Sequence, residues 1–209
     1  MKTSIKSILA LAVTAVVLTG STLTVNAGEP KATTVLTNVK KVNKINVAGN
    51  VELILVQSEN ESVKVYDNYF ANNALVQQKD GELRISSFSK EKLTVVAYVN
   101  SLSEISASEN ASVKTAGKFS TLSLDVNLSD NATADLNTNT ISLNTNLSNT
   151  ASLNLAGSTE EYNAKMGNFA KVSMGKFVAT NTNIQSKSVV VAKVVEATPF
   201  ANEADFFNL

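Results

Sequence analysis

Carboxylates are the side chains in this sequence whose types and spacing could support catalysis. The 209 residues contain no histidine and no cysteine. Nucleophiles that depend on histidine are therefore excluded, and so are zinc sites built on histidine or cysteine ligands. Glu109 and Asp130 occupy equivalent positions in successive sequence repeats, and Asp125 and Asp135 lie nearby. Paired carboxylates of this kind could hydrolyse a glycosidic bond or bind calcium.

The acidic positions do not continue along the repeats. Asn149 and Asn168 replace the acids in the third and fourth repeats, so no column of carboxylates forms. The glycine-rich nonapeptide that binds calcium in repeat toxins is also missing from the sequence. We therefore expect these acids to be solvated turn residues, and we predict no catalytic residue, no metal site and no cofactor.

Two other groups of polar or aromatic residues are candidates for ligand binding. They are a set of turn asparagines and a pair of tyrosines. Asn110 and Asn131 form a column with Thr150, Asn149 and Asn168 stand one place earlier in their repeats, and the tyrosines are Tyr66 and Tyr69. The asparagines could present amides to a glycan, or they could bond to one another as a structural ladder that stabilises the turns. The tyrosines could stack on a sugar ring, or they could cover the open end of a stack of repeats.

The elements that must position these side chains are sequence repeats of nearly constant length. An alanine recurs in each repeat, and the intervals between successive alanines are 21, 19 and 19: Ala111, Ala132, Ala151 and Ala170. Before these turns, apolar residues alternate with polar ones, and we expect the apolar set to face inward: Leu122, Leu124, Val126 and Leu128; Ile141, Leu143, Thr145 and Leu147; Tyr162, Ala164 and Met166. A fixed period with strand-type alternation predicts stacked rungs that share one apolar interior.

The sequence thus predicts an all-β fold, specifically a right-handed parallel β-helix with rungs of about 19–21 residues. A more irregular β region precedes the repeats and is expected to continue the same stack. Its predicted strands are 42–48, 51–56, 62–66, 74–78, 82–87 and 93–99. Gly49 and Asn50 predict a break between two strands, and Asp80–Gly81 predicts a type I′ hairpin turn.

The two ends of the chain have compositions of their own. Lys2 and Lys6 precede an apolar run over 8–18, and Ala27 ends a small-residue cleavage site, which is typical of a secretory signal peptide. This apolar run is too short to span a bilayer. We predict a signal peptide (1–27), a linker (28–38), a β-helix domain (39–196) and an aromatic tail (197–209) that caps the stack.

The balance of charge limits the partners. The chain has 18 basic and 18 acidic residues, which argues against binding to nucleic acid or to anionic lipid. After the signal peptide no stretch has eighteen continuous apolar residues, so we expect no membrane span in the mature chain. The expected location is therefore the periplasm or the cell surface, in association with the outer membrane.

Several segments resemble a known family. The run from Ile45 to Leu53, the alternation of Val63 and Val65, and the segment from Asp80 to Ile85 are similar to the head GIN domain, a putative auto-transporter adhesin family (domain of unknown function 2807) of exported Bacteroidetes proteins. The resemblance covers about residues 39–194 and implies a β-helix and an adhesin-like role. The family's turns are usually rich in glycine, whereas here they carry mainly Glu, Asp, Asn, Thr and Ala.

These observations predict an exported, non-enzymatic β-helix module that adheres to a polysaccharide or to a protein of the cell envelope. The basis is a long regular surface of Ser, Thr, Asn and Asp without a convergent catalytic set. Two alternatives stay open: a polysaccharide-active enzyme that uses carboxylates such as Glu109 and Asp130, and a purely structural envelope protein.

Overall fold

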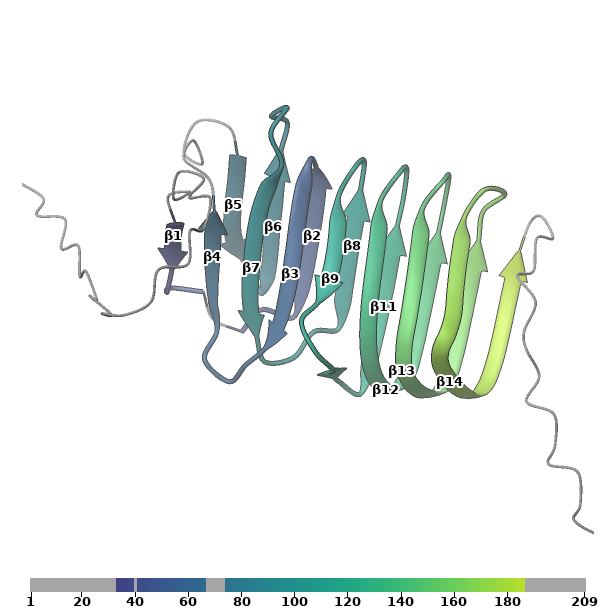
Figure 1. Cartoon of the computed structure of the whole chain (residues 1–209). Helices are drawn as coiled ribbons and strands as arrows, with labels where there is room; N and C mark the ends of the chain where they lie inside the picture. The colour runs from purple at the N-terminus through teal and green to yellow at the C-terminus, as the bar shows by residue number, and fades with distance from the viewer. Residues whose placement is uncertain (1–32, 40, 67–73, 187–209) are drawn as a thin grey trace, which may run out of the picture. The chain divides into compact units, whose positions relative to one another are not determined.

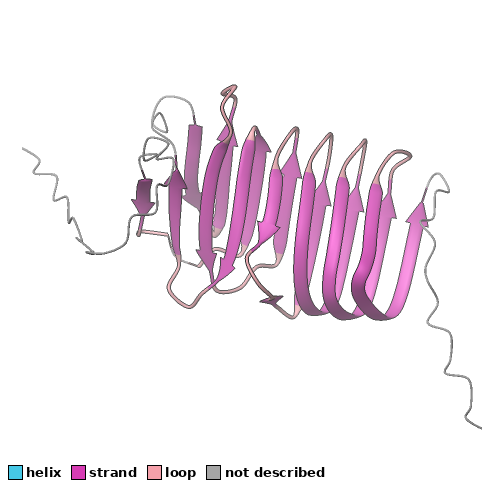
Figure 2. Cartoon of the chain, in the orientation of Figure 1, coloured by secondary structure: helices cyan, strands magenta, loops and turns pink. Residues whose placement is uncertain are grey.

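The computed structural model describes residues 33–39, 41–66 and 74–186, and within these ranges it contains strands and no helix (Figures 1 and 2). The all-β class is therefore confirmed for the described residues. In chain order the strands are β1 (Thr33–Leu36), β2 (Lys44–Gly49), β3 (Val51–Gln57), β4 (Ser62–Tyr66), β5 (Ala74–Lys79), β6 (Glu82–Ser87), β7 (Leu93–Val99), β8 (Glu104–Ser108), β9 (Ser112–Thr115), β10 (Phe119–Ser120), β11 (Ser123–Leu128), β12 (Thr133–Leu147), β13 (Ser152–Met166) and β14 (Lys171–Ser186).

The strands form one curled sheet with two walls. In the first wall β6, β2, β8 and β11 lie side by side in parallel, followed by the second halves of β12, β13 and β14. In the second wall β7, β3 and β9 are followed by the first halves of the same three long strands. Figure 1 shows these long strands bending at their lower ends, so each one contributes to both walls.

The register of paired strands follows the intervals between the turn alanines. From β12 to β13, Thr133 pairs with Ser152 and Leu147 with Met166, which is the interval from Ala132 to Ala151. From β9 to β12, Ser112 pairs with Thr133, which is the longer interval from Ala111 to Ala132. Between β13 and β14 a bulge after Asn154 lengthens the interval by one. Hydrophobic period and backbone pairing therefore agree over the C-terminal half.

The N-terminal strands depart from the predicted arrangement. β2 and β3 lie between β6 and β7 on one side and β8 and β9 on the other, so the order in space is not the order in sequence. β1, β4 and β5 pair antiparallel with their neighbours, which makes the sheet mixed. A parallel β-helix over the whole predicted domain is thus replaced by a mixed sheet. One cause is the two-residue turn at Asp80 and Gly81, whose φ angles of 51° and 80° impose an antiparallel hairpin.

The turns above the rungs are tight for the predicted reason. Ala111, Ala132 and Ala151 are fully buried, and the N–H of Ala132 donates to the carbonyl of Ser129 across the turn (3.0 Å). The residue two positions before each of these alanines has a left-handed φ of 56–60°, at Glu109, Asp130 and Asn149. Asp and Asn tolerate this conformation better than most residues. The equivalent position in the β2–β3 rung is Gly49, where a Cβ would lie 2.1 Å from the carbonyl oxygen of Ser87.

Two of the predicted inward residues face outward. Leu122 is 75% exposed and Ile141 is 48% exposed. The alternation breaks at the lower bend of each rung: Thr140 is buried, and the next two residues turn outward before Leu143 is buried. The bend therefore resets which residues face the core.

The described residues begin inside the predicted linker. Part of the predicted linker (28–38) forms β1, which pairs antiparallel with β4 along the outer edge of the second wall. The predicted signal peptide and the aromatic tail lie outside the described residues. Within the described ranges, no helix is long and apolar enough to cross a membrane.

Candidate ligand-binding surface

Three of the predicted turn asparagines, Asn110, Asn131 and Asn149, form side-chain hydrogen bonds from one turn to the next. Asn149 Nδ2 donates to Asp130 Oδ1 (2.8 Å), and the backbone N–H of Glu109 donates to Asp130 Oδ2 (3.2 Å). Asn131 Nδ2 reaches Asn110 Oδ1 at 3.4 Å. The structure therefore places Asn110 and Asn131 in one series of bonded turn residues, and Asn149 in a neighbouring series with Asp130 and Glu109. Asn168 lies exposed in the turn before β14.

The predicted aromatic pair is not part of this ladder. Tyr66 is the last residue of β4 and is half-buried, opposite Thr33 of β1 and Thr94 of β7. β7 and β3 separate β4 from β9, which follows the first of the ladder turns. Tyr69 lies outside the described residues. The two predicted groups thus form no common site through Tyr66.

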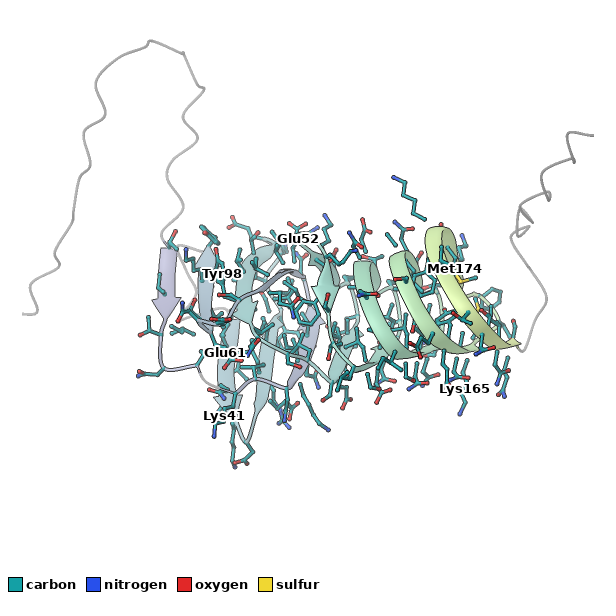
Figure 3. The ribbon with its side chains drawn as sticks, turned by 90° about the horizontal axis from the view of Figure 1, so that it is seen from below. Lys41, Glu52, Glu61, Tyr98, Lys165 and Met174 are labelled. Atoms are coloured by element: carbon teal, nitrogen blue, oxygen red, sulfur yellow. The ribbon has the colours of Figure 1, made fainter. Side chains whose placement is uncertain are left out.

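A second polar surface covers the outside of the first wall, and we call it the asparagine face. Its side chains stand in two neighbouring columns that run across β8, β11, β12, β13 and β14. They surround a hollow of about 540 Å³. The residues of the asparagine face are Glu104, Asp125, Asn127, Asn144, Asn146, Asn163, Lys165, Asn183 and Gln185. In Figure 3, Lys165 of this face and Glu52 of the second wall lie along opposite edges of the molecule.

Hydrogen bonds between rungs orient the amides of the asparagine face. Asn144 Nδ2 donates to Asp125 Oδ1 (2.8 Å), and Asn163 Nδ2 donates to Asn144 Oδ1 (3.1 Å). An asparagine amide has two N–H donors and an oxygen with two lone pairs. The ladder uses one donor and one lone pair of Asn144, so this amide keeps one of each for a ligand. Its orientation is already set before any ligand arrives.

The edge of the asparagine face is charged. Glu104 forms an ion pair with Lys44 of the neighbouring strand at 3.1 Å and accepts a hydrogen bond from Ser106 at 3.2 Å. Asn127 Nδ2 lies 3.4 Å from the same carboxylate. Side-chain contacts therefore form two separate groups on this face, one from β2 to β11 and one from β11 to β13. The surface can offer both donors and acceptors to one extended partner.

The second wall offers a smaller version of the same pattern. Asn154 Nδ2 donates to Asp135 Oδ1 (3.1 Å), again from one rung to the next. Lys114 Nζ donates to Glu52 Oε1 at 2.7 Å, and this hydrogen bond lowers the pKa of the Glu52 carboxyl below its ordinary value. This wall thus provides matched control positions for experiments on the asparagine face.

A third feature, the lower groove, runs along the bends of the rungs and has a volume of about 1530 Å³. Exposed aliphatic side chains line part of it: Leu122, Ile141 and Val178. Lys41 and Glu61 lie at its N-terminal end and are labelled in Figure 3, which views the molecule from below. The Glu61 carboxylate accepts long hydrogen bonds from the backbone N–H groups of Val42 and Asn100, both at 3.4 Å.

The acids considered for catalysis are not gathered at one point. Asp125 lies on the first wall and Asp135 on the second, so the interior separates them. Only Glu109 and Asp130 are adjacent, and the Asp130 carboxylate accepts bonds from Glu109, Ser129 and Asn149. Among the described residues, no group of three or more acids, histidines or cysteines could hold a metal ion.

Both the asparagine face and the lower groove were missed as sites in the sequence. The asparagines of the face are the outward members of the same strands whose inward residues revealed the repeat, so a count of amides at every second position would have found them. The groove could not be found in this way, because Leu122 and Ile141 continue the inward alternation in the sequence until the bend is known.

Taken together, the geometry defines an all-β protein with stacked parallel rungs and regular polar outer faces. Residues 41–196 match the family described as putative auto-transporter adhesin, head GIN domain (domain of unknown function 2807). The chain belongs to this family. No functionally curated protein matches the sequence.

Solved structures of low sequence identity share the fold. A putative adhesin from Parabacteroides distasonis is 16% identical with a TM-score of 0.59, covering 74% of this chain and 77% of its own. A putative adhesin from Parabacteroides merdae is 19% identical with a TM-score of 0.57 and the same coverages. A protein from Parabacteroides distasonis named a putative lipid binding protein is 13% identical with a TM-score of 0.57, covering 74% of this chain and 78% of its own.

Proposed function

We propose that this protein is an exported, non-enzymatic, adhesin-like module that holds a polysaccharide on its asparagine face. The observation that carries the proposal is the bonded series Asp125–Asn144–Asn163, which links three successive rungs and orients the amides of two of them. Family membership supports an adhesin-like role in general. The ladder supplies a specific surface for it.

The chemistry of this face suits the hydroxyl groups of a sugar. A hydroxyl both donates and accepts, and a partly used asparagine amide offers one group of each kind. Because neighbouring amides bond to one another, few rotamers must be frozen when a ligand binds, and the entropic cost of binding is smaller. Strands repeat every 4.7–4.9 Å or so across a sheet. An extended polymer can therefore contact several rungs at once, and weak contacts add up.

The positions of the acids support the non-enzymatic reading. Glycoside hydrolysis needs two carboxyl groups that flank one bond, about 5 to 9.5 Å apart. Asp125 and Asp135 are on opposite walls, and Asp130 is engaged by three donors in a turn.

Glycan binding is the direct test of this proposal. The purified chain is screened on a glycan array, and the best ligand is then titrated against an Asn144→Ala/Asn163→Ala variant. We expect at least a tenfold loss of affinity, because two oriented amides are removed. The matched control is Asn154→Ala, which breaks an equivalent rung-to-rung bond on the second wall and should bind normally. Equal affinity of both variants would contradict the proposal, and so would reproducible cleavage of the glycan.

Export is the second part of the proposal. The signal peptide predicted over 1–27 and the family's description support a location in the periplasm or at the cell surface. N-terminal sequencing of the exported protein should begin at Gly28. Protease treatment of intact cells should remove the protein if it is on the surface and leave it intact if it is periplasmic. Detection of the uncleaved chain in the cytoplasm alone would contradict export.

We also infer that the parallel rungs wind as a right-handed coil. Connections between parallel strands of one sheet are right-handed in the great majority of proteins, and the tight turns between walls leave no room for a longer path. An experimental structure of the mature domain would test this handedness directly.

A second candidate function rests on the lower groove. Leu122, Ile141 and Val178 are 48–75% exposed and lie in one hollow, where an acyl chain could bind. The name of one structurally similar protein, a putative lipid binding protein, makes this worth testing. Titration with a fluorescent fatty acid should show binding that Leu122→Asp abolishes and that Leu75→Asp, a change at an exposed leucine of β5, leaves intact. Absence of binding by the unaltered chain would remove this candidate.

A further inference from the structure

The described part of the sheet ends in a long open edge at β14. This strand has 16 residues and, among the described strands, pairs only with β13. Its inward side chains are only partly buried, whereas Leu153 and Leu155 in the equivalent half of β13 are 1% exposed. The partly buried set is Val172, Met174, Phe177 and Ala179. An uncovered edge of this length promotes association with other strands, and natural proteins usually cover it.

The chain continues beyond this edge to Leu209, and its next part has the composition of a strand. Valine and alanine fill residues 189–192, and two more valines follow Lys193. β-branched residues favour strands. The family match extends to residue 196, ten residues past the end of β14.

We propose that residues 191–194 pair in parallel with the start of β14 as one further rung. The expected register is Val191 opposite Lys171, Ala192 opposite Val172, Lys193 opposite Ser173, and Val194 opposite Met174. This register keeps the interval found between β13 and β14 after the bulge, from the pair Ala156–Lys176 to the pair Met166–Ser186. The segment would cover the exposed interior of the first half of β14.

Two features of the sequence select this register. Four residues connect β12 to β13, and four connect β13 to β14. Four residues would likewise lie between Ser186 and Val191. The proposed register places Ala192 and Val194 over the interior and Lys193 on the outer face. A pairing interval shorter by one residue would turn Lys193 inward, because a slip of one residue exchanges the two faces of a strand.

The occupant is this segment of the same chain rather than a second copy. A tether of four residues gives the segment an effective concentration in the millimolar range or above, which a separate molecule in dilute solution does not reach. A second copy would also lose translational and rotational freedom on binding. An intermolecular strand is therefore the competing outcome of the test.

Disulfide trapping in the full chain tests the register. Because the chain has no natural cysteine, the two introduced thiols have no other cysteine in the chain to pair with. In the variant Ser173→Cys/Lys193→Cys the two Cα atoms should be within the 4.4–6.8 Å or so that a disulfide requires. Mild oxidation should then remove both free thiols while the protein stays monomeric. The matched control, Ser173→Cys/Val191→Cys, places the second cysteine on the same outer face but two residues out of register, so it should link far less efficiently.

Three results would overturn the proposal. They are equal linking in both variants, no linking in either, and a disulfide between two chains in place of one within a chain. Hydrogen exchange on the unaltered protein provides a readout without mutations. Slow exchange of the amides of residues 192–194 is expected, whereas exchange at the rate of an unfolded peptide would contradict the pairing.

Discussion

Two buried threonines of β12 should respond in opposite directions to the same substitution. Thr138 and Thr140 both face the interior, and their exposed fractions are 0% and 6%. Thr140 Oγ1 donates to Thr159 Oγ1 on the next rung at 2.9 Å. Thr138 Oγ1 has no hydrogen-bond partner among the described residues. Exchange of each threonine for valine keeps the shape of the side chain and replaces the hydroxyl with a methyl group.

The sizes of the two effects follow from the hydrogen bonds. A buried polar group without a partner costs about 1–3 kcal/mol, so we expect Thr138→Val to raise the free energy of unfolding by about 1–2 kcal/mol. Thr140→Val removes one satisfied hydrogen bond and should lower that free energy by about 1 kcal/mol. For a chain of this size, each 1 kcal/mol corresponds to roughly 2–4 °C in melting temperature.

Urea denaturation of the two variants and the unaltered protein gives the comparison. The midpoints should move in opposite directions while the slope of the transition stays constant, because the surface exposed on unfolding is the same. Destabilisation by Thr138→Val would refute the reasoning, since it would mean that its hydroxyl is satisfied by a buried water molecule. Stabilisation by Thr140→Val would refute the value given to the Thr140–Thr159 bond.

Three further perturbations test the turns, the charges and the chain end. Gly157→Ala should destabilise the fold by at least about 2 kcal/mol, because its φ is +97° and the new Cβ would lie 2.0 Å from the carbonyl oxygen of Thr138. Gly175→Ala is the control and should be tolerated, because no atom lies within 4 Å of its new Cβ. Equal urea midpoints for the two variants would contradict this prediction. The lowered pKa of Glu52 contributes stability that is present above its ordinary value of 4.5 and lost as the pH falls through the folded-state value. Lys114→Met should therefore move the Glu52 carboxyl titration upward by NMR, and an unchanged titration would show that the 2.7 Å contact is not formed in solution. Deletion of residues 200–209 should cause aggregation in size-exclusion chromatography if the predicted tail is a cap, whereas a monodisperse product would remove that role.

Features that depend on neighbouring residues could be predicted from the sequence. The strands 62–66, 82–87 and 93–99 have the predicted bounds, because period-two alternation and local turn residues define them. The hairpin at Asp80–Gly81 has the predicted positive φ angles. The buried turn alanines and the register between β12 and β13 also agree, since a fixed repeat aligns the same side chain on every rung.

The candidate surfaces could be predicted only in part. Asn110 lines up with Asn131 and Asn149 lines up with Asp130, but the hydrogen bonds within these two pairs cannot be read from the sequence. Other asparagines form the asparagine face. Which of them lie next to one another depends on the pairing of strands one full repeat apart. Spacing alone therefore identified a repeating polar surface without showing which of its amides are bonded from one rung to the next.

By itself the sequence determined the strands, their turns and the repeat length, because these depend on side-chain alternation and on backbone preferences of adjacent residues. Only the tertiary structure decided that β6 and β7 lie outside β2 and β3, that β1, β4 and β5 run antiparallel, and that Leu122 faces solvent. The reason is physical. Some pairs join segments far apart in the chain, such as Lys44 with both Glu82 and Glu104. Such pairing depends on which arrangement buries the most apolar surface of the whole chain, and this cannot be read from any local sequence pattern.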